Sequence, residues 1–431
     1  MAPLDPPAAD APAPQPAPAP QATPAPQATQ AEAAAALTDA VAVRYARMPY
    51  PDPRIGATGR VVWNDPTVYR SLFWPCEALG APGAAPDLLV AGCGTGEAVA
   101  VALANPAAQV LGIDVSAPSL ALSAALAARH GLTNLEHRQL PLEHIGRLER
   151  CFDWIGAAGV LHHLADPAAG LAALGAALKP HGVVVGAVYG AEARLGLGLL
   201  QQTFADLGLG DRPEDAEAVR ATLQSLPGHH PARGWLSQAG EAFGPDAHVL
   251  DTFNHPREVA FEAAAVPALV ARAGLAFQGW FARSAYEPDG FLLPEHPLFL
   301  HLDALPEPQR WAACARLSSP PDHTFIACRA DRDPAAWRPA LDADDPHFAQ
   351  LVPGRRFPPM VARPPLPYDP RQAIQAALYD RIDGVTPTGA LLDAALPGAE
   401  PGFRRLYGAA FLRHLWRKDA VYLGWPRPQK P

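Results

Sequence analysis

The sequence predicts an α/β fold, with a Rossmann-like, mostly parallel sheet and helices on both of its faces. One observation is a short apolar run at 88–91 that breaks into three closely spaced glycines before an alanine-rich helical segment. Another is a second apolar run, 109–113, that ends at Asp114. Apolar runs and helical segments then keep alternating along the chain, which is typical of a parallel sheet.

The turn after the first expected strand has glycine at alternate positions, Gly92, Gly94 and Gly96. Glycine lets the backbone turn sharply and approach a ligand closely, and the helix that follows offers unpaired N–H groups. Asp114 ends the next strand, where a carboxylate can accept hydrogen bonds from ribose hydroxyls. Proteins that bind NAD and methyltransferases that use S-adenosylmethionine (SAM) share these two features, but the glycine spacing here departs from G-x-G-x-x-G.

Composition and charge exclude several classes. The net charge of −9 over 431 residues argues against a broad surface for nucleic acid or an anionic membrane. No apolar run approaches the roughly 20 residues of a membrane helix, and the N-terminus lacks the pattern of a secretory signal. The five cysteines are scattered without C-x-x-C spacing, so we expect reduced thiols in a cytoplasmic protein and no metal site.

Further elements follow in chain order. Ser116 is expected to cap a helix that ends at Gly131, and Asp166 with Pro167 starts another. The apolar runs expected as strands after the first are residues 109–114, 134–138, 152–155, 183–189, 276–281 and 323–328.

Composition divides the chain into four regions. Residues 1–36, almost all Ala, Pro and Gln, are expected to be a disordered tail. Residues 37–332 form the α/β domain with a helical insertion at about 190–250, and 333–370 is a proline-rich linker. Residues 371–425 read as a small α-rich, winged-helix-like unit, whose modest charge favours homodimerisation or docking of a protein partner over DNA binding.

Six segments recur in a characteristic order and spacing: Leu88–Gly96, Ile113-Asp114, Phe152-Asp153, Gly159–Leu164, Leu178–Gly182 and Tyr189. With them the chain resembles the class I SAM-dependent methyltransferases over roughly 43–330. Within that superfamily it looks like the bacterial branch often fused to tetratricopeptide repeats, which has an arm similar to Tyr45–Pro53 and a segment similar to Asp251–Glu258. Repeats of that length are absent from this chain.

The resemblance implies SAM as cofactor, with the glycine turn around its methionine part, Asp114 on the ribose and Val115 beside the adenine. Val90 stands where the family motif has an acid for the methionine amino group. No acid follows the third strand, so we expect Gln139 and the Leu140 backbone to replace it near the adenine. The implied cofactor-binding residues are Ala91, Gly92, Cys93, Gly94, Thr95, Gly96, Asp114, Val115, Gln139, Leu140 and Gly159.

Methyl transfer from a sulfonium is an in-line displacement, which demands alignment and, where the nucleophile begins protonated, a base. No fixed catalytic pair is therefore required. The candidates at the open ends of the strands are His162, His163, Tyr189, Asp251 and His255. The paired histidines have a second interpretation, as support for the cofactor loop, and the Tyr45 arm is either packed on the surface or a lid over the cofactor.

We therefore expect a SAM-dependent methyltransferase that acts on a small-molecule or peptide acceptor. The alternative is a non-catalytic SAM-fold scaffold or binding protein. An NAD-dependent oxidoreductase fits the glycine turn and Asp114 but not the segments Gly159–Leu164 and Leu178–Gly182.

Overall fold

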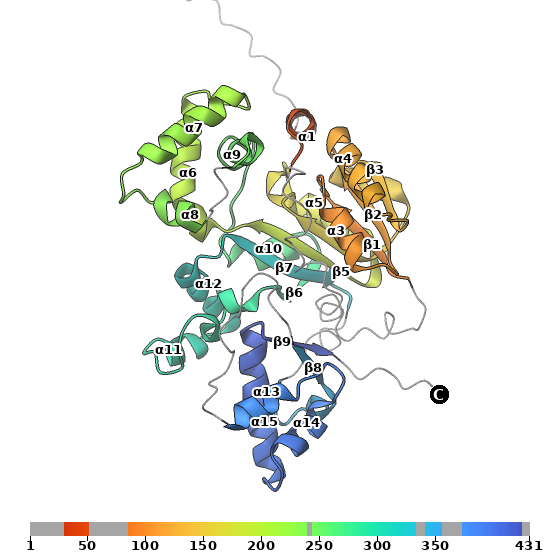
Figure 1. Ribbon diagram of the computed structural model, residues 1–431, viewed down its shortest axis with the longest axis vertical. Coiled ribbons are helices and arrows are strands. Elements are labelled where there is room, and N and C mark those ends of the chain that lie inside the picture. Colours follow the sequence, from red (N-terminus) through yellow and green to blue (C-terminus); the bar gives the residue numbers. More distant parts are fainter. Residues whose placement is uncertain (1–29, 51–84, 239–243, 333–340, 356–372, 425–431) are drawn as a thin grey trace, which may run out of the picture.

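The computed structural model describes residues 30–50, 85–238, 244–332, 341–355 and 373–424 (Figure 1). Most of the expected tail (residues 1–29), residues 333–340 and 356–370 of the expected linker, and residues 371, 372 and 425 of the expected C-terminal unit lie outside this part of the chain. Within it, no helix combines the length and apolar character that crossing a membrane requires.

A seven-stranded sheet with the order β3-β2-β1-β4-β5-β7-β6 forms the centre of the molecule (Figure 1). Its strands are β1 (Asp87–Ala91), β2 (Gln109–Asp114), β3 (Leu135–Gln139), β4 (Phe152–Ala158), β5 (Leu178–Tyr189), β6 (Leu275–Trp280) and β7 (Asp322–Arg329). The first five are parallel, and β7 runs antiparallel between β5 and β6. The mostly parallel α/β fold predicted from the sequence is confirmed.

Helices cover both faces of this sheet, because successive side chains of each strand point to opposite sides. In β1, Leu88 and Val90 pack into one core, and Leu89 and Ala91 pack into the other. The helices that supply the partners are α3 (Glu97–Ala104) and α4 (Ala117–Arg129) on the first face and α5 (Pro167–Ala176) and α10 (Ala265–Arg272) on the second.

Strand β5 begins earlier than the sequence predicts, at Leu178 instead of Val183. Leu178 pairs with Phe152 of β4, and the register shifts before Trp154. The Asp153 carboxylate, 6% exposed, accepts hydrogen bonds from Lys179 Nζ (2.8 Å) and His181 Nε2 (2.7 Å). These side-chain bonds hold the proline-containing start of β5 against β4, which local sequence rules do not anticipate.

Helix α1 (Gln30–Arg47) corrects part of the expected disordered tail, because residues 30–36 are helical. The segment is nearly all alanine, and alanine has the highest helix propensity of any residue. Thr38 Oγ1 donates a hydrogen bond to Glu143 Oε1 (3.2 Å), so this helix also contacts the α/β domain.

The helical insertion is confirmed as α6 (Ala191–Asp206), α7 (Pro213–Ser225), α8 (Ala232–Gln238) and α9 (Asp246–Phe253). These helices, green in the upper left of Figure 1, enclose an apolar core of their own. The rings of Phe204 and Trp235 both pack edge-on against Phe253 of α9. Helix α9 is thereby fixed at the end of the insertion, immediately before the polar segment that begins at Asn254.

The C-terminal unit contains α13 (Ala373–Asp380), α14 (Thr388–Ala395), α15 (Pro401–Arg417) and the strand β9 (Val421–Gly424), in agreement with the α-rich unit expected there. It differs from expectation at its start. Strand β8 (Val352–Arg355), in the predicted linker, pairs antiparallel with β9, and Phe348 packs into the same core. Local sequence hides this strand because Pro353 and Gly354 disfavour strands, but a two-stranded sheet has only edge strands, where proline is tolerated.

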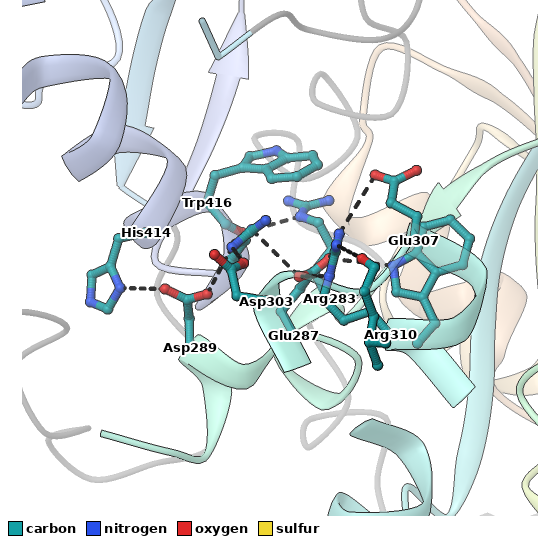
Figure 2. A network of polar contacts seen from close by, with 11 residues as sticks. Arg283, Glu287, Asp289, Asp303, Glu307, Arg310, His414 and Trp416 are labelled. Atoms are coloured by element: carbon teal, nitrogen blue, oxygen red, sulfur yellow. Dashed lines mark hydrogen bonds and ion pairs between the residues drawn. The ribbon is translucent and has the colours of Figure 1, made fainter. Parts of the chain in front are cut away.

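A buried polar network joins the C-terminal unit to the α/β domain (Figure 2). Arg417 of α15 contacts three carboxylates, those of Glu287 (3.4 Å), Asp289 (3.3 Å) and Asp303 (2.6 Å), and only 16% of its side chain is exposed. His414, one turn earlier, contacts Asp289 at 2.7 Å. Asp303 ends the short helix α11 (Phe299–Asp303), and α12 (Glu307–Ser318) contributes Arg310, which pairs with Glu287.

We expect Arg417→Ala to lower the free energy of unfolding of the full chain by about 3 kcal/mol, because the buried carboxylates of Glu287 and Asp289 lose one of their cations while Arg310 and His414 remain. Urea denaturation measures this change. The matched control is Arg272→Ala, at a side chain that is 70% exposed and 4.0 Å from Asp166, where we expect less than about 0.5 kcal/mol. Equal effects for the two variants would mean that the network does not hold the unit in place.

Candidate functional site

The turn between β1 and α3 lies at the carboxyl end of the sheet. The N–H groups of Gly92 and Cys93 donate to the Ile113 carbonyl at 2.9 and 3.0 Å. Gly92 and Gly94 have φ of 69° and 53°, in the left-handed region that favours glycine. A Cβ on Gly92 would lie 2.9 Å from the Cβ of Val160, so the turn after β1 and the loop after β4 approach as closely as only glycine permits.

The Asp114 carboxylate holds this turn in place. Its Oδ2 accepts the Gly94 N–H and its Oδ1 accepts the Ser116 N–H, both at 2.8 Å. Burial raises the pKa of Asp114, and the backbone hydrogen bonds from Ser116 and Gly94 offset part of that rise. Each oxygen has lone pairs for a further hydrogen bond, so the carboxylate can fix the turn and still accept from a ligand.

The other residues predicted to contact a cofactor surround this pair. Cys93 and Thr95 are buried, each 1% exposed. Gln139 Nε2 donates to the Val115 carbonyl (2.9 Å), and the Leu140 N–H donates to the Asp114 carbonyl (3.0 Å). The Leu140 N–H is therefore engaged within the protein.

The loop after β4 leaves open space beside the turn. Gly159 has a φ of 71°, and a Cβ there would meet no atom within 4 Å among the described residues. Ala91 and Gly96 lie at the two ends of the glycine turn, and Ala91 is buried. The backbone of the two loops thus frames a cradle at the carboxyl ends of β1, β2 and β4.

Helix α1 lies over this edge of the sheet. Ser116 Oγ donates to the Tyr45 carbonyl (3.0 Å), and the Tyr45 hydroxyl donates to Asp251 Oδ1 of α9 (2.9 Å). The Tyr50 ring packs edge-on against His248, at 5.0 Å between centroids. Helix α1 therefore connects the start of α4 to the helical insertion, and the lid interpretation of this arm stays a prediction.

The five predicted catalytic residues come together beside this helix. The ring centroids of His162 and Tyr189 are 3.8 Å apart, and those of His163 and His255 are 3.7 Å apart and stacked. The His162 and His163 rings are themselves 4.2 Å apart. Asp251 is 4% exposed and joins the group through Tyr45, whose ring lies 6.0 Å from His255.

Two residues that the sequence analysis did not single out organise this cluster. The guanidinium of Arg194 lies 3.8 Å from the centre of the Tyr189 ring and pairs with both oxygens of Glu258, at 2.8 and 2.7 Å. Tyr189 is therefore held between Arg194 and His162. Arg194 lies in the helical insertion, and no local sequence pattern predicts its pairing with Glu258, 64 residues later.

The Arg257 carbonyl fixes the orientation of two imidazoles. It lies 2.8 Å from Nδ1 of His163 and 2.6 Å from Nδ1 of His255. The Arg257 N–H also lies 3.1 Å from Nδ1 of His255, but two lone pairs repel each other at 2.6 Å, so we assign the His255 proton to Nδ1, where it is donated to the carbonyl. In this tautomer His255 has a lone pair on Nε2, which is buried and has no partner among the described residues. His255 thus presents a hydrogen-bond acceptor to a ligand.

The histidines of the cluster are neutral. Burial lowers the pKa of His163 and, together with the neighbouring His163 and Arg194, lowers that of His162 well below its ordinary value. Burial, followed by the charges of His163 and Arg44, lowers the pKa of His255 to about 2. A group with so low a pKa is a weak base, so the His255 imidazole is a poor proton acceptor.

No group of three or more His, Cys, Asp or Glu side chains within the described ranges could hold a metal ion.

Part of the α/β domain matches a known family. Residues 89–184 match the model of a methyltransferase domain. An uncharacterized protein of Synechococcus sp. is 31% identical over 272 residues, which are 59% of this chain and 62% of that relative. A ubiquinone biosynthesis O-methyltransferase of Acinetobacter baumannii is 32% identical over 131 residues, 28% of this chain and 54% of the enzyme. The chain thus spans less than two thirds of either relative.

Among solved structures, PKMT2 from Rickettsia typhi has a TM-score of 0.58 at 14% identity, over 84% of this chain and 75% of that protein. The same protein in complex with AdoHcy has a TM-score of 0.57, at 14% identity and over 86% and 76% of the two chains. At this identity the likeness shows a shared fold, that of the class I methyltransferases. The placement in a bacterial branch with repeat fusions stays a prediction.

We expect the free energy of unfolding to fall as the pH drops below about 6.5, the ordinary pKa of histidine. The folded state keeps His162, His163 and His255 neutral, whereas the unfolded chain takes up protons there, so this stability is fully present above about pH 6.5 and is lost below it. His255→Gln should remove up to about 1.4 kcal/mol per pH unit from the slope.

Urea denaturation between pH 7.5 and 5.0 measures this slope. His229→Gln, at an exposed position, is the matched control and should leave the slope as in the wild type. A His255→Gln slope that equals the wild-type slope would show that this imidazole is protonated in the folded protein.

Proposed function

We propose that this chain, which contains a methyltransferase domain with the class I fold, binds SAM and transfers its methyl group to a small-molecule or peptide acceptor. The observation that carries this proposal is the Asp114 carboxylate, which closes the glycine turn through Gly94 and faces the cradle framed by the loops after β1 and β4. The matching family model covers these elements, and PKMT2, of the same fold, has been solved with AdoHcy.

The residues of the cradle fit the parts of SAM. The turn from Ala91 to Gly96 would hold the methionine part, Asp114 the ribose hydroxyls, and Val115 with Gln139 and Leu140 the adenine. Because the Leu140 N–H already donates to Asp114, Leu140 would offer its side chain and carbonyl. Gly159, with open space beside it, would allow the reacting end of the cofactor to reach the second cluster.

When bound, SAM supplies a methyl group activated on a sulfonium. The chain's own contribution is alignment, exclusion of water and management of one proton. Tyr189, clamped by Arg194 and His162, would line the acceptor site. The lone pair on His255 Nε2 would orient an O–H or N–H of the acceptor. Asp251 would receive the proton, because within the described residues its carboxylate accepts a side-chain hydrogen bond from Tyr45 alone.

The homodimer or protein partner expected through the C-terminal unit, and the cytoplasmic location, also stay predictions.

We expect Asp114→Asn to weaken binding of S-adenosylhomocysteine (SAH) by about 10- to 100-fold, because it removes a charged hydrogen-bond acceptor. Calorimetry of the full chain measures the dissociation constants. The variant should also lose about 1–2 kcal/mol of stability, since the new amide cannot accept from both Gly94 and Ser116.

Asp331→Asn serves as the matched control, because this side chain is 66% exposed. It follows strand β7, which β4 and β5 separate from β1. It should bind SAH as the wild type does. Unchanged affinity of Asp114→Asn would remove the ribose assignment.

The alternative is a non-catalytic scaffold, and the weak basicity of His255 favours this alternative. Turnover distinguishes it from an enzyme. We expect SAH to accumulate when the protein is incubated with SAM and a panel of small molecules and peptides, and Asp251→Asn to slow this turnover by about 10²–10⁴-fold, the typical worth of a general base. Tight SAM binding without turnover of any acceptor in the panel would favour the scaffold.

A further inference from the structure

Arg44 of helix α1 is a buried cation that has no counter-ion among the described residues. The residue is 6% exposed, and its Nη1 donates only a long hydrogen bond, 3.3 Å, to the Asn254 carbonyl. Its Nη2 is buried and has no hydrogen-bond partner in the described part of the chain, where Arg44 also makes no ion pair. Buried guanidinium groups are ordinarily paired with carboxylates.

Two unpaired acceptors lie next to this unpaired donor. Asn254 Oδ1 and His255 Nε2 are buried and lack partners among the described residues. Asn254 Nδ2 donates to the Gly210 carbonyl (2.8 Å), which fixes the direction of the amide. The charge of Arg44 lowers the pKa of His255, so the guanidinium and this imidazole share one environment.

Arg44 is also held in position by the helix around it. The next residue, Tyr45, is bonded through its carbonyl to Ser116 and through its hydroxyl to Asp251. Ser116 in turn donates its N–H to Asp114. The residue that follows Arg44 is therefore hydrogen-bonded to both the cofactor cradle and the acceptor cluster, and the guanidinium itself bonds to the Asn254 carbonyl.

We propose that Arg44 binds a carboxylate of a ligand that enters between α1, the cradle and the segment that follows α9. A carboxylate satisfies a guanidinium with charge-assisted hydrogen bonds, and Asn254 Oδ1 with His255 Nε2 would accept from a neighbouring ammonium or hydroxyl. This inference rests on the proposed function, because it completes the same site.

Two sources of this carboxylate fit the site. One is the carboxylate in the methionine part of the cofactor. Val90, the residue before the last one of β1, replaces the acid that would bind the amino group of this part. The other is the acceptor. Both make the same contact with Arg44, and they differ in which ligand loses affinity when the guanidinium is removed.

The test compares Arg44→Met with the wild type by calorimetry, using SAH and 5′-methylthioadenosine, which has neither carboxylate nor ammonium. If the carboxylate belongs to the cofactor, the variant weakens SAH binding by about 10- to 100-fold and leaves methylthioadenosine binding unchanged. If it belongs to the acceptor, both nucleosides bind as in the wild type, and acetate raises the unfolding temperature of the SAH-saturated wild type but not of the variant.

Stability separates this role from a structural one. Removal of an unpaired buried charge should leave the unfolding temperature of the ligand-free protein unchanged or raise it. Arg47→Met, on the same helix at a side chain that is 66% exposed, is the matched control and should change neither binding nor the acetate response.

The proposal is overturned if Arg44→Met changes neither SAH binding nor the acetate response. A markedly lower unfolding temperature, with both ligand responses intact, would assign Arg44 to structure alone. If the wild type fails to bind SAH, the proposed function fails, and the acetate titration of the ligand-free protein still decides whether Arg44 takes a carboxylate.

Discussion

The site depends on one half-buried carboxylate. Asp114 binds the N–H of Gly94 with one oxygen and the N–H of Ser116 with the other. The first bond shapes the glycine turn, and the second places Ser116, whose hydroxyl holds the carbonyl of Tyr45. Tyr45 then reaches Asp251. A single strand-end acid thus connects the turn, helix α1 and the insertion, so its loss affects the cofactor cradle and the acceptor cluster together.

The second constraint is electrostatic. Three imidazoles lie within one cluster, and burial lowers the pKa of each of them, so they pack as neutral aromatic groups. The two arginines beside this cluster differ in whether a carboxylate neutralises them. Arg194 is neutralised by Glu258 and supports Tyr189, whereas Arg44 has no carboxylate partner among the described residues. Arg194 is thus paired and structural, whereas Arg44, which has no such pair among the described residues, is the cation that we propose for a ligand.

Sequence alone predicted the central sheet because its signals are local. The alternating side chains of β1, the glycines after it and Asp114 all lie within 28 residues of one another. The positions of His162, His163, Tyr189, Asp251 and His255 at one edge followed from strand ends and from the family resemblance. Their mutual contacts did not, because they depend on the path of the insertion, which no short pattern encodes.

Three features were not predicted from the sequence: strand β8, the start of helix α1 and the burial of Arg44. Strand β8 carries Pro353 and Gly354 and forms only because β9, about 70 residues later, pairs with it. Helix α1 begins at Gln30 because a polyalanine run favours helix even beside a proline-rich segment. Arg44 looks like an ordinary surface residue in the sequence, whereas in the fold it is 6% exposed and its Nη2 has no partner among the described residues.

The most direct measurement of the central claim is a crystal structure of the full chain with SAH. The account predicts the ligand in the cradle, with its ribose hydroxyls on the Asp114 carboxylate and its homocysteine end directed toward Gly159 and the histidine cluster. A ligand bound elsewhere on the molecule, or an Asp114 carboxylate without contact to it, would contradict the account.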